Sequence, residues 1–370
     1  MPVEKKRPRG LKGSAAAKAS KKTKTDEQPE STAEFPENAQ TVVIDKIVEE
    51  GDEVGEAAAL FESAMQKLET DPTAALPLLR GTIHESDRIL RNHNDKEPLP
   101  ALFYYTYGSA LYELGRLTED EEFEPYLDAA EDRLNESLEC KDADLESKIH
   151  IALAKIWLAK AAGTVSEGDQ KVPELSLKAL TTLDEALGSA RVDSGVIIEL
   201  ADIVQNHGDL YEKLESRDIF RSWAENALEK VLKDEPTNAS ALSGLGYCKL
   251  SFANYLLDNI QETDDDVEKT ELSKDEVKAY NAILESKKYF EKAKEELIKV
   301  EKVSPQILSD LAETYLNEAN LVLNEEEQLA IYQNAVDSIK EANALIKEKK
   351  LDFALPDALS SFLEEFQAEH

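Results

Sequence analysis

Two prolines in this 370-residue chain are each followed, ten residues later, by a glycine inside a helical pattern: Pro98 precedes Gly108, and Pro236 precedes Gly246. A proline ends a helix because it lacks the amide hydrogen that the next turn needs, and a glycine lets two helices approach closely. Helix–turn–helix units of about 34 residues with such a pattern are typical of tetratricopeptide repeats. The spacing therefore predicts stacked helix pairs.

Two residue types also recur at fixed offsets before three prolines. A small residue stands 12 positions before the proline and a leucine stands 8 positions before it, in the pairs Ala224 and Leu228, Ala293 and Leu297, and Ser86 and Leu90. The small side chain allows close packing, and the leucine fills the seam between the helices. We expect an all-α, tetratricopeptide-like solenoid of irregular antiparallel helix pairs, in which each repeat contacts its neighbours.

The charge distribution separates the chain into two parts. The formal net charge is −34, yet residues 1–24 contain nine basic side chains and one carboxylate. This segment has almost no large apolar side chain, so we expect a disordered basic arm. An acidic linker follows it to residue 54, and the solenoid occupies 55–370. The apolar pattern predicts a last helix pair over about 305–324 and 326–348, and a capping helix over 356–366.

Two clusters of the arm, residues 5–9 and 21–24, resemble a two-part nuclear localisation signal. We expect an importin to bind its basic side chains, which are Lys5, Lys6, Arg7, Arg9, Lys21, Lys22 and Lys24. The alternatives are a tail without this role, a tail that folds back on the acidic body, and an arm that contacts RNA. The acidic body itself repels phosphates, so no direct nucleic-acid binding is expected.

We find no motif for catalysis. The chain has no phosphate loop, no glycine-rich dinucleotide turn and no His-Glu-x-x-His, and its five histidines lack a metal-binding spacing. We therefore expect no cofactor and no enzyme activity. No apolar run or leader indicates a membrane span or secretion. Cys140 and Cys248 are expected to be small buried side chains in a reducing compartment, which favours the cytosol or nucleus.

In repeats of this kind, one face of the first helix of each pair commonly binds partners. Counted from the seam glycine, the positions three before, one after and four after it face that surface. The candidates for partner binding are Tyr105, Tyr112, Asp202 and Tyr247. Exposed tyrosines make good anchors for a partner. The alternative is that they pack on neighbouring helices. Repeats of this class that bind chaperone tails hold the terminal carboxylate of the tail with Lys, Arg and Asn at these positions. This chain lacks those residues there, which disfavours a role as a chaperone cofactor.

The segment Gly-Thr-Ile-His-Glu-Ser-Asp-Arg-Ile-Leu-Arg over residues 81–91, with the basic start and the acidic linker, resembles the fungal enhancer of translation termination family. The resemblance implies a nuclear, all-helical adaptor that binds a prolyl-hydroxylase-like oxygenase dependent on iron and 2-oxoglutarate. It further implies roles in the import and restraint of that oxygenase, in translation termination, and in oxygen or sterol signalling. Iron and 2-oxoglutarate would belong to the partner.

A second reading of the same chain is an acidic nuclear chaperone. In this reading the body shields a basic client, such as a ribosomal protein or a histone, and the arm carries the pair to the nucleus. An enzyme is the third and least favoured reading.

Overall fold

A computed structural model describes residues 48–49, 51–68, 71–94, 98–118, 123–165, 171–260 and 271–369. Within these ranges the regular secondary structure consists of thirteen helices and no strand. The all-α prediction is therefore confirmed. The helices divide into two compact units, α1–α6 and α7–α13, which are described separately. The basic arm and most of the linker lie outside the described residues, and the division of the chain into arm, linker and solenoid stays a prediction.

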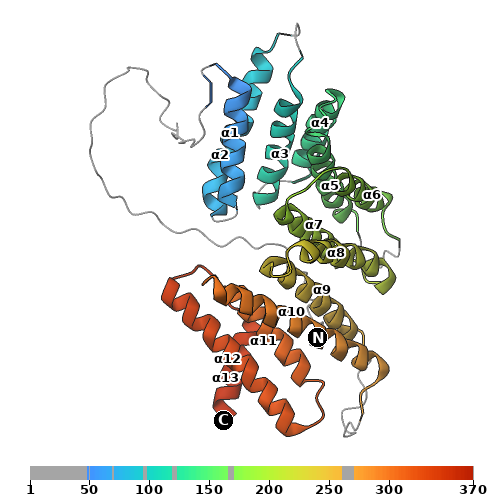
Figure 1. Cartoon of the computed structure of the whole chain (residues 1–370), viewed down its shortest axis with the longest axis vertical. Coiled ribbons are helices and arrows are strands. Elements are labelled where there is room, and N and C mark those ends of the chain that lie inside the picture. Colours follow the sequence, from blue (N-terminus) through green and yellow to red (C-terminus); the bar gives the residue numbers. More distant parts are fainter. Residues whose placement is uncertain are drawn as a thin grey trace, which may run out of the picture. The chain divides into compact units, whose positions relative to one another are not determined.

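The first unit contains three helix pairs (Figure 1). They are α1 (Glu53–Leu68) with α2 (Pro72–Asn92), α3 (Ala101–Leu117) with α4 (Phe123–Glu139), and α5 (Glu146–Ala162) with α6 (Glu174–Ser189). Asp71 and Pro72 together start α2: the Asp71 carboxylate accepts the Ala74 amide at 3.1 Å, and Pro72 occupies the first turn, where its missing amide hydrogen costs nothing.

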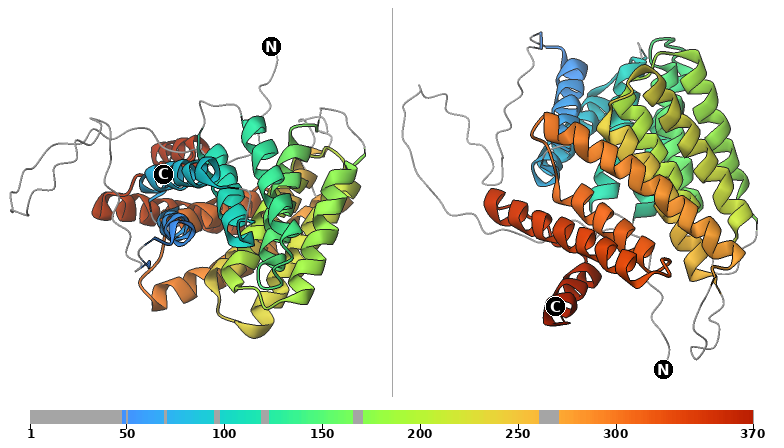
Figure 2. Two further views of the ribbon diagram at one scale, coloured as in Figure 1. Left: turned by 90° about the horizontal axis from the view of Figure 1, so that it is seen from above. Right: turned by 60° about the horizontal axis from the view of Figure 1, so that its bottom comes forward.

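The second unit also contains three pairs, followed by one more helix. The pairs are α7 (Ser194–Gly208) with α8 (Leu214–Asp234), α9 (Ala239–Asp258) with α10 (Lys274–Lys299), and α11 (Pro305–Ala319) with α12 (Glu325–Lys349). The additional helix is α13 (Asp357–Glu369), which lies against the last pair (Figure 2). Side-chain caps start several of these helices, and Ser273 and Glu276 form a reciprocal capping box at α10.

The glycines of the predicted seams lie where two helices approach closely. A Cβ on Gly108 would stand 2.9 Å from the backbone oxygen of Ala130 and from Leu134, and a Cβ on Gly246 would stand 2.8 Å from the Phe290 ring. Both distances are too short for any residue larger than glycine without movement of the partner helix. The close approach that the sequence predicted at Gly108 and Gly246 is confirmed.

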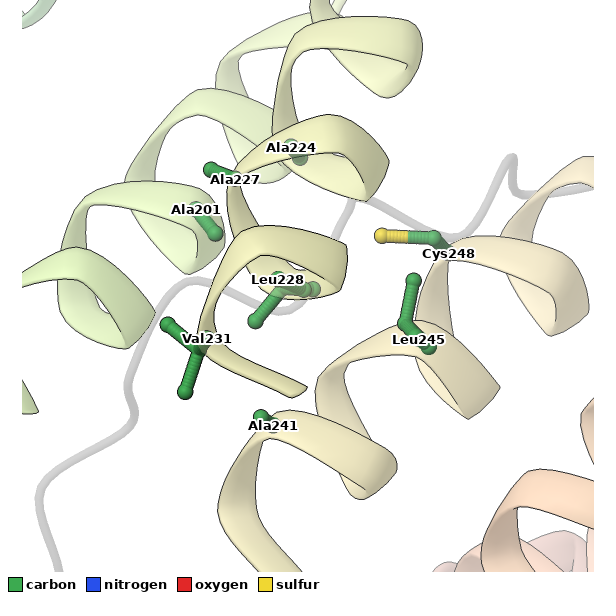
Figure 3. Close-up of a cluster of buried hydrophobic side chains, with 8 residues drawn as sticks. All are labelled: Ala201, Ala224, Ala227, Leu228, Val231, Ala241, Leu245 and Cys248. Atoms are coloured by element: carbon green, nitrogen blue, oxygen red, sulfur yellow. The ribbon is translucent and has the colours of Figure 1, made fainter. Parts of the chain in front are cut away.

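The predicted small residues and leucine of α8 lie in a buried cluster that joins three helices of the second unit (Figure 3). Ala201 comes from α7, Leu228 and Ala224 from α8, and Leu245 and Cys248 from α9. Leu228 is 2% exposed, so its side chain contributes about 2 kcal/mol through burial. This packing connects the α7–α8 pair to the α9–α10 pair, as a repeat architecture requires.

The two cysteines differ. Cys248 is buried as the sequence predicted, but the expectation of burial is wrong for Cys140, which is exposed. Cys140 follows the last turn of α4, where the chain reverses at Lys141 with a φ of 55°. Among the described helices, none combines the length and the apolar character needed to cross a bilayer.

Candidate protein-binding site on α7 and α9

The two tyrosines predicted for the first unit lie on α3, and neither is freely exposed. Tyr105 is half-buried, and its ring meets Phe61 edge-on at 6.5 Å. Tyr112 is 7% exposed and lies 6.2 Å from the ring of Phe123. The expected exposure is wrong for Tyr112, because the start of α4 covers it. A role of Tyr105 in binding stays a prediction.

In the second unit, the two remaining candidates lie near each other. Asp202 is on α7, Tyr247 is on α9, and Asn206 joins them. The Tyr247 hydroxyl donates to Asn206 Oδ1 at 3.4 Å, and the Asn206 side chain is hydrogen-bonded to Asp202. Asp202 is exposed and Tyr247 partly buried. The three side chains form a polar row across two helices, with a carboxylate open to solvent at one end.

The row carries negative charge that its own surroundings do not balance. The pKa of Asp202 is raised, because packing against neighbours removes part of its hydration and because Glu199 and Asp209 add negative charge nearby. The pKa of the Tyr247 hydroxyl is raised too, mainly by burial and then by Asp209 and Asp202. In the described part of the chain no lysine or arginine pairs with Asp202. A cation supplied by a partner would therefore be stabilised here.

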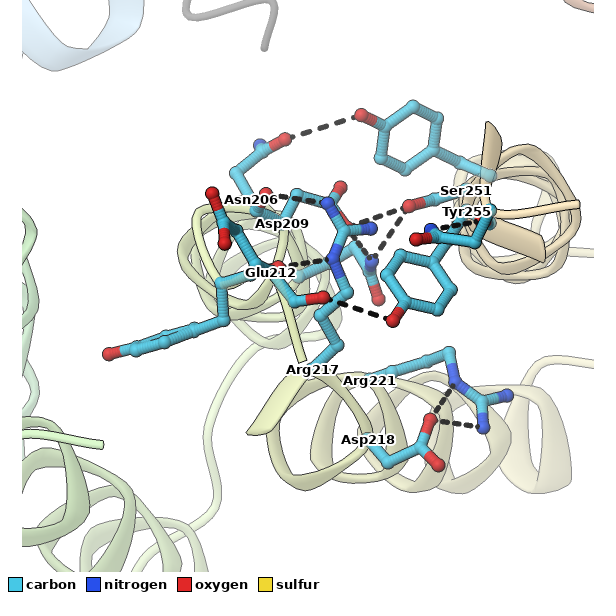
Figure 4. Close-up of polar contacts among 12 residues, drawn as sticks. Asn206, Asp209, Glu212, Arg217, Asp218, Arg221, Ser251 and Tyr255 are labelled. Carbon is cyan, nitrogen blue, oxygen red and sulfur yellow. Dashed lines mark hydrogen bonds and ion pairs between the residues drawn. The ribbon is translucent and has the colours of Figure 1, made fainter. Parts of the chain in front are cut away.

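A part-buried network of hydrogen bonds lies beside this row (Figure 4). The Asp209 carboxylate accepts hydrogen bonds from Ser251 at 2.7 Å, from Gln205 at 3.1 Å and from Arg217 at 3.2 Å. Burial nonetheless raises the pKa of Asp209, since the loss of hydration outweighs these favourable contacts. The network fixes the end of α7 against α9, so Asn206 and Tyr247 are held in register.

Arg217 connects the start of α8 to the same network. Its guanidinium donates to the backbone oxygens of Asp209 and Tyr211, each at 2.7 Å, and lies 4.8 Å from the centre of the Tyr255 ring. The Tyr255 hydroxyl donates to the backbone oxygen of Glu212 at 3.0 Å (Figure 4). Two carbonyls of the α7–α8 turn thus find a charged donor, which makes this turn a rigid support.

The supporting network encloses little space. A cavity of about 10 Å³ lies beside Gln205, whose Oε1 is buried without a hydrogen-bond partner. This volume suits a single water molecule, which would satisfy that oxygen. It is too small for a metabolite. Among the described residues, no group of three His, Cys, Asp or Glu side chains is placed to hold a metal ion.

Sequence reasoning found Asp202 and Tyr247 but missed the residues that accompany them. Asn206 and Ser251 each lie four positions further along the same helices, so the helical repeat places them on the same face. A search for polar residues at this spacing would have found both. Arg217 left no such signal, because its partners are backbone oxygens of a turn whose path depends on the fold.

The motif over residues 81–91 proves to be a packing element of the first unit. Asp87 accepts a hydrogen bond from the Tyr107 hydroxyl at 2.5 Å, which joins α2 to α3. Arg88 pairs with Glu85 on α2 and with Glu53 on α1. Thr82 and Ser86 are fully buried. The motif therefore connects three helices, and the Asp87 carboxylate is engaged by a tyrosine.

Stacked helix pairs place this chain among the α-helical repeat proteins. Residues 3–241 match the family model described as nuclear pore complex subunit Nro1, and the chain belongs to this family. Two solved structures agree. One, of the S. pombe nuclear import adaptor Nro1, aligns with a TM-score of 0.52 and 24% identity over 85% of this chain and 99% of that one. Another, described as the hypoxic regulator of sterol synthesis Nro1 and a nuclear import adaptor, gives 0.53 and 25% over 86% and 94%.

Curated relatives come from fungi. A Schizosaccharomyces pombe protein named negative regulator of ofd1 is 37% identical over 131 residues, which is 33% of each chain. A Yarrowia lipolytica protein named enhancer of translation termination 1 is 25% identical over 84% of this chain and 86% of its own length. The match thus spans a third of the fission-yeast relative. The resemblance stated from the sequence is confirmed, and the chain is a nuclear protein.

Proposed function

We propose that this chain is a non-enzymatic nuclear adaptor that binds a prolyl-hydroxylase-like oxygenase, supports its import through an importin, and regulates it. Iron and 2-oxoglutarate belong to the partner in this proposal. The name of the fission-yeast relative, negative regulator of ofd1, and the import-adaptor structures support it. The names of other relatives link the same role to translation termination and to hypoxic sterol regulation.

In this proposal the row of Asp202, Asn206 and Tyr247 is the surface that contacts the oxygenase. Tyrosine supplies a large, rigid contact that retains a polar end, which is why it is common at binding hot spots. Asp202 adds an exposed carboxylate without a cationic neighbour in the described residues, and it would attract a lysine or arginine of the partner. A charge at such a position mainly sets the rate of association and the specificity.

A binding measurement with the purified oxygenase tests the proposal. We expect Asp202→Lys to weaken binding about tenfold, or about 1.4 kcal/mol, because the partner's cation then meets a like charge. Tyr247→Phe tests the hydroxyl with little change in packing. The matched control is Asp132→Lys, a charge reversal at an exposed position of α4 in the other unit. If both reversals act alike, the row is not the site. If the unaltered chain does not bind the oxygenase, the proposed function is wrong.

The acidity of the chain favours one other candidate, the chaperone of a basic client, because the formal net charge is −34. Salt separates the two. Attraction between exposed charges is largely screened at a few hundred millimolar salt, where the screening length falls to roughly 3–8 Å. A complex that depends on Tyr247 and buried contacts should survive 500 mM NaCl. A complex that dissociates completely there, and that forms equally with histones, would favour the chaperone.

A further inference from the structure

A second surface of the same unit is a groove between α12 and α13. None of the residues that line it belongs to the polar row. Leu329 and Tyr332 line it from α12, and Phe362 and Phe366 line it from α13; Gln328, Glu325 and Glu365 complete its wall. The open volume is about 490 Å³, within the range of pockets that bury part of a ligand or a few side chains of a partner. No described residue covers it.

The base of the groove is a row of aromatic rings. The ring centres of Tyr332 and Phe362 are 5.5 Å apart, and those of Phe362 and Phe366 are 5.8 Å apart. The Tyr332 hydroxyl donates to Asn320 Oδ1 at 2.8 Å, which holds that ring in place. The three rings are only partly buried, and Leu329 is 45% exposed. Such a preformed apolar surface gains free energy when a partner covers it.

The apolar stripe of α13 is broader than the contact that holds this helix. Leu359 is 3% exposed and packs with Ala312 and Ile339, which anchors α13 to the α11–α12 pair. Phe362 and Phe366 follow at helical spacing, and they extend the stripe past the buried contact into the open groove. The stripe thus has one side against the α11–α12 pair and another side along the groove.

The charges around the groove are of one sign. Glu325 and Glu365 line it, and Glu326, Glu327 and Glu364 are exposed beside them. Among the described residues, the lining contains no lysine, arginine or histidine. An occupant with basic residues next to its apolar side chains would complement this rim, and an acidic or neutral one would not.

We propose that this groove binds an amphipathic helix of another protein, with apolar residues at positions i, i+3, i+4 and i+7 and with Lys or Arg on both sides of that stripe. The mode is that of a helix in a groove, in which aromatic and aliphatic anchors supply affinity and the rim charges supply specificity. The proposal goes beyond the adaptor function and uses residues that have no part in the polar row.

The test measures binding of a fluorescein-labelled, 18-residue Leu/Lys peptide of that pattern to the full chain in 150 mM NaCl. The comparison peptide has the same composition in scrambled order. We expect the patterned peptide to bind, and Leu329→Ser and Phe366→Ser each to weaken it at least about fivefold. Ile298→Ser, at a residue of α10 that is 55% exposed, is the matched control and should change nothing. Equal binding of the scrambled peptide, or equal loss in the control, would overturn the proposal.

The test uses both Leu329→Ser and Phe366→Ser, because Phe366→Ser alone could weaken the packing of α13. Leu329 is on α12, so its replacement leaves the Leu359 anchor intact, and circular dichroism checks the helix content of each variant. Light scattering identifies other occupants: a dimer of the unaltered chain that Leu329→Ser dissociates would show a second copy in the groove. Peptide binding that appears only after deletion of residues 1–47 would show a segment of this chain there. Either outcome contradicts the proposal.

Discussion

At the scale of single residues, burial determines the protonation state of His207 in the second unit. His207 is 4% exposed, and its Nε2 lies 3.1 Å from the Tyr211 hydroxyl. The rings of Tyr211 and Phe220 pack against it, with ring centres 5.6 and 4.9 Å away. This burial disfavours the charged imidazolium and lowers the pKa of His207 to about 4. The fold therefore requires the neutral form.

This shift makes the stability of the second unit depend on pH. Because the folded pKa is below the unfolded value of 6.5, the unfolded chain binds more protons between pH 6.5 and about 4. We expect the contribution of His207 to be full above pH 6.5 and to fall as the pH drops to about 4, by up to about 3 kcal/mol in total. Urea unfolding of a Trp157→Phe chain, in which Trp223 of α8 reports on this unit, measures it.

The decisive comparison is between two histidine variants in that background. His207→Phe should remove much of the acid sensitivity, although it also loses the Tyr211 contact. His84→Gln, at an exposed position of α2, should leave the pH dependence unchanged. Identical pH profiles for His207→Phe and the unaltered chain would show that this histidine is not kept neutral by the fold.

At the scale of helices, the close contacts between the two helices of a pair determine how tightly the pair packs. A Cβ on Gly108 of α3 would meet a backbone oxygen, that of Ala130 on α4, as well as the side chain of Leu134. A backbone atom cannot turn aside as a side chain can, so a larger residue would require α4 itself to move. Gly81 of α2 offers the contrast, because no atom lies within 4 Å of the Cβ that an alanine would add there. The two glycines differ in surroundings but both lie inside helices.

Alanine at these two glycines should therefore have opposite effects. Gly108→Ala should lower the free energy of unfolding of the first unit by about 1–3 kcal/mol, because overpacking outweighs the gain in helix propensity. Gly81→Ala should raise it by roughly 0.5–1 kcal/mol, since only the propensity changes. Urea unfolding followed by Trp157 fluorescence, in a Trp223→Phe chain, measures both. Equal stabilisation by both substitutions would contradict close packing at the α3–α4 seam.

The sequence predicted the elements better than the surfaces. The helix pair and the capping helix expected near the end of the chain agree closely in order and in starting position with α11, α12 and α13, because proline and apolar spacing act locally. The exposure of Tyr112 could not be read this way, since it depends on where the start of α4 lies. The Arg217 network depends on backbone oxygens of a turn, and no sequence pattern encodes those. The groove between α12 and α13 likewise depends on how one helix docks.

At the scale of the whole molecule, basic side chains are concentrated in residues 1–24, and the rest of the chain is acidic. The described helices carry an acidic surface and the polar row, whereas the basic side chains of the proposed import signal lie outside the described residues. In this proposal the import signal and the polar row lie in separate parts of the sequence, so an importin and the oxygenase need not compete for one surface. The proposal thus predicts that import can be removed without loss of oxygenase binding.

The most direct test of the adaptor account is the nuclear fraction of the fluorescently tagged oxygenase in cells that carry this chain as their sole copy. The test variant has alanine at seven positions: Lys5, Lys6, Arg7, Arg9, Lys21, Lys22 and Lys24. The control variant has alanine at Lys230 and Lys233 of α8, which are exposed. The account predicts that the oxygenase leaves the nucleus only with the test variant, still binds it, and returns when an unrelated import signal is fused to it. An oxygenase that stays nuclear with the test variant would contradict the account.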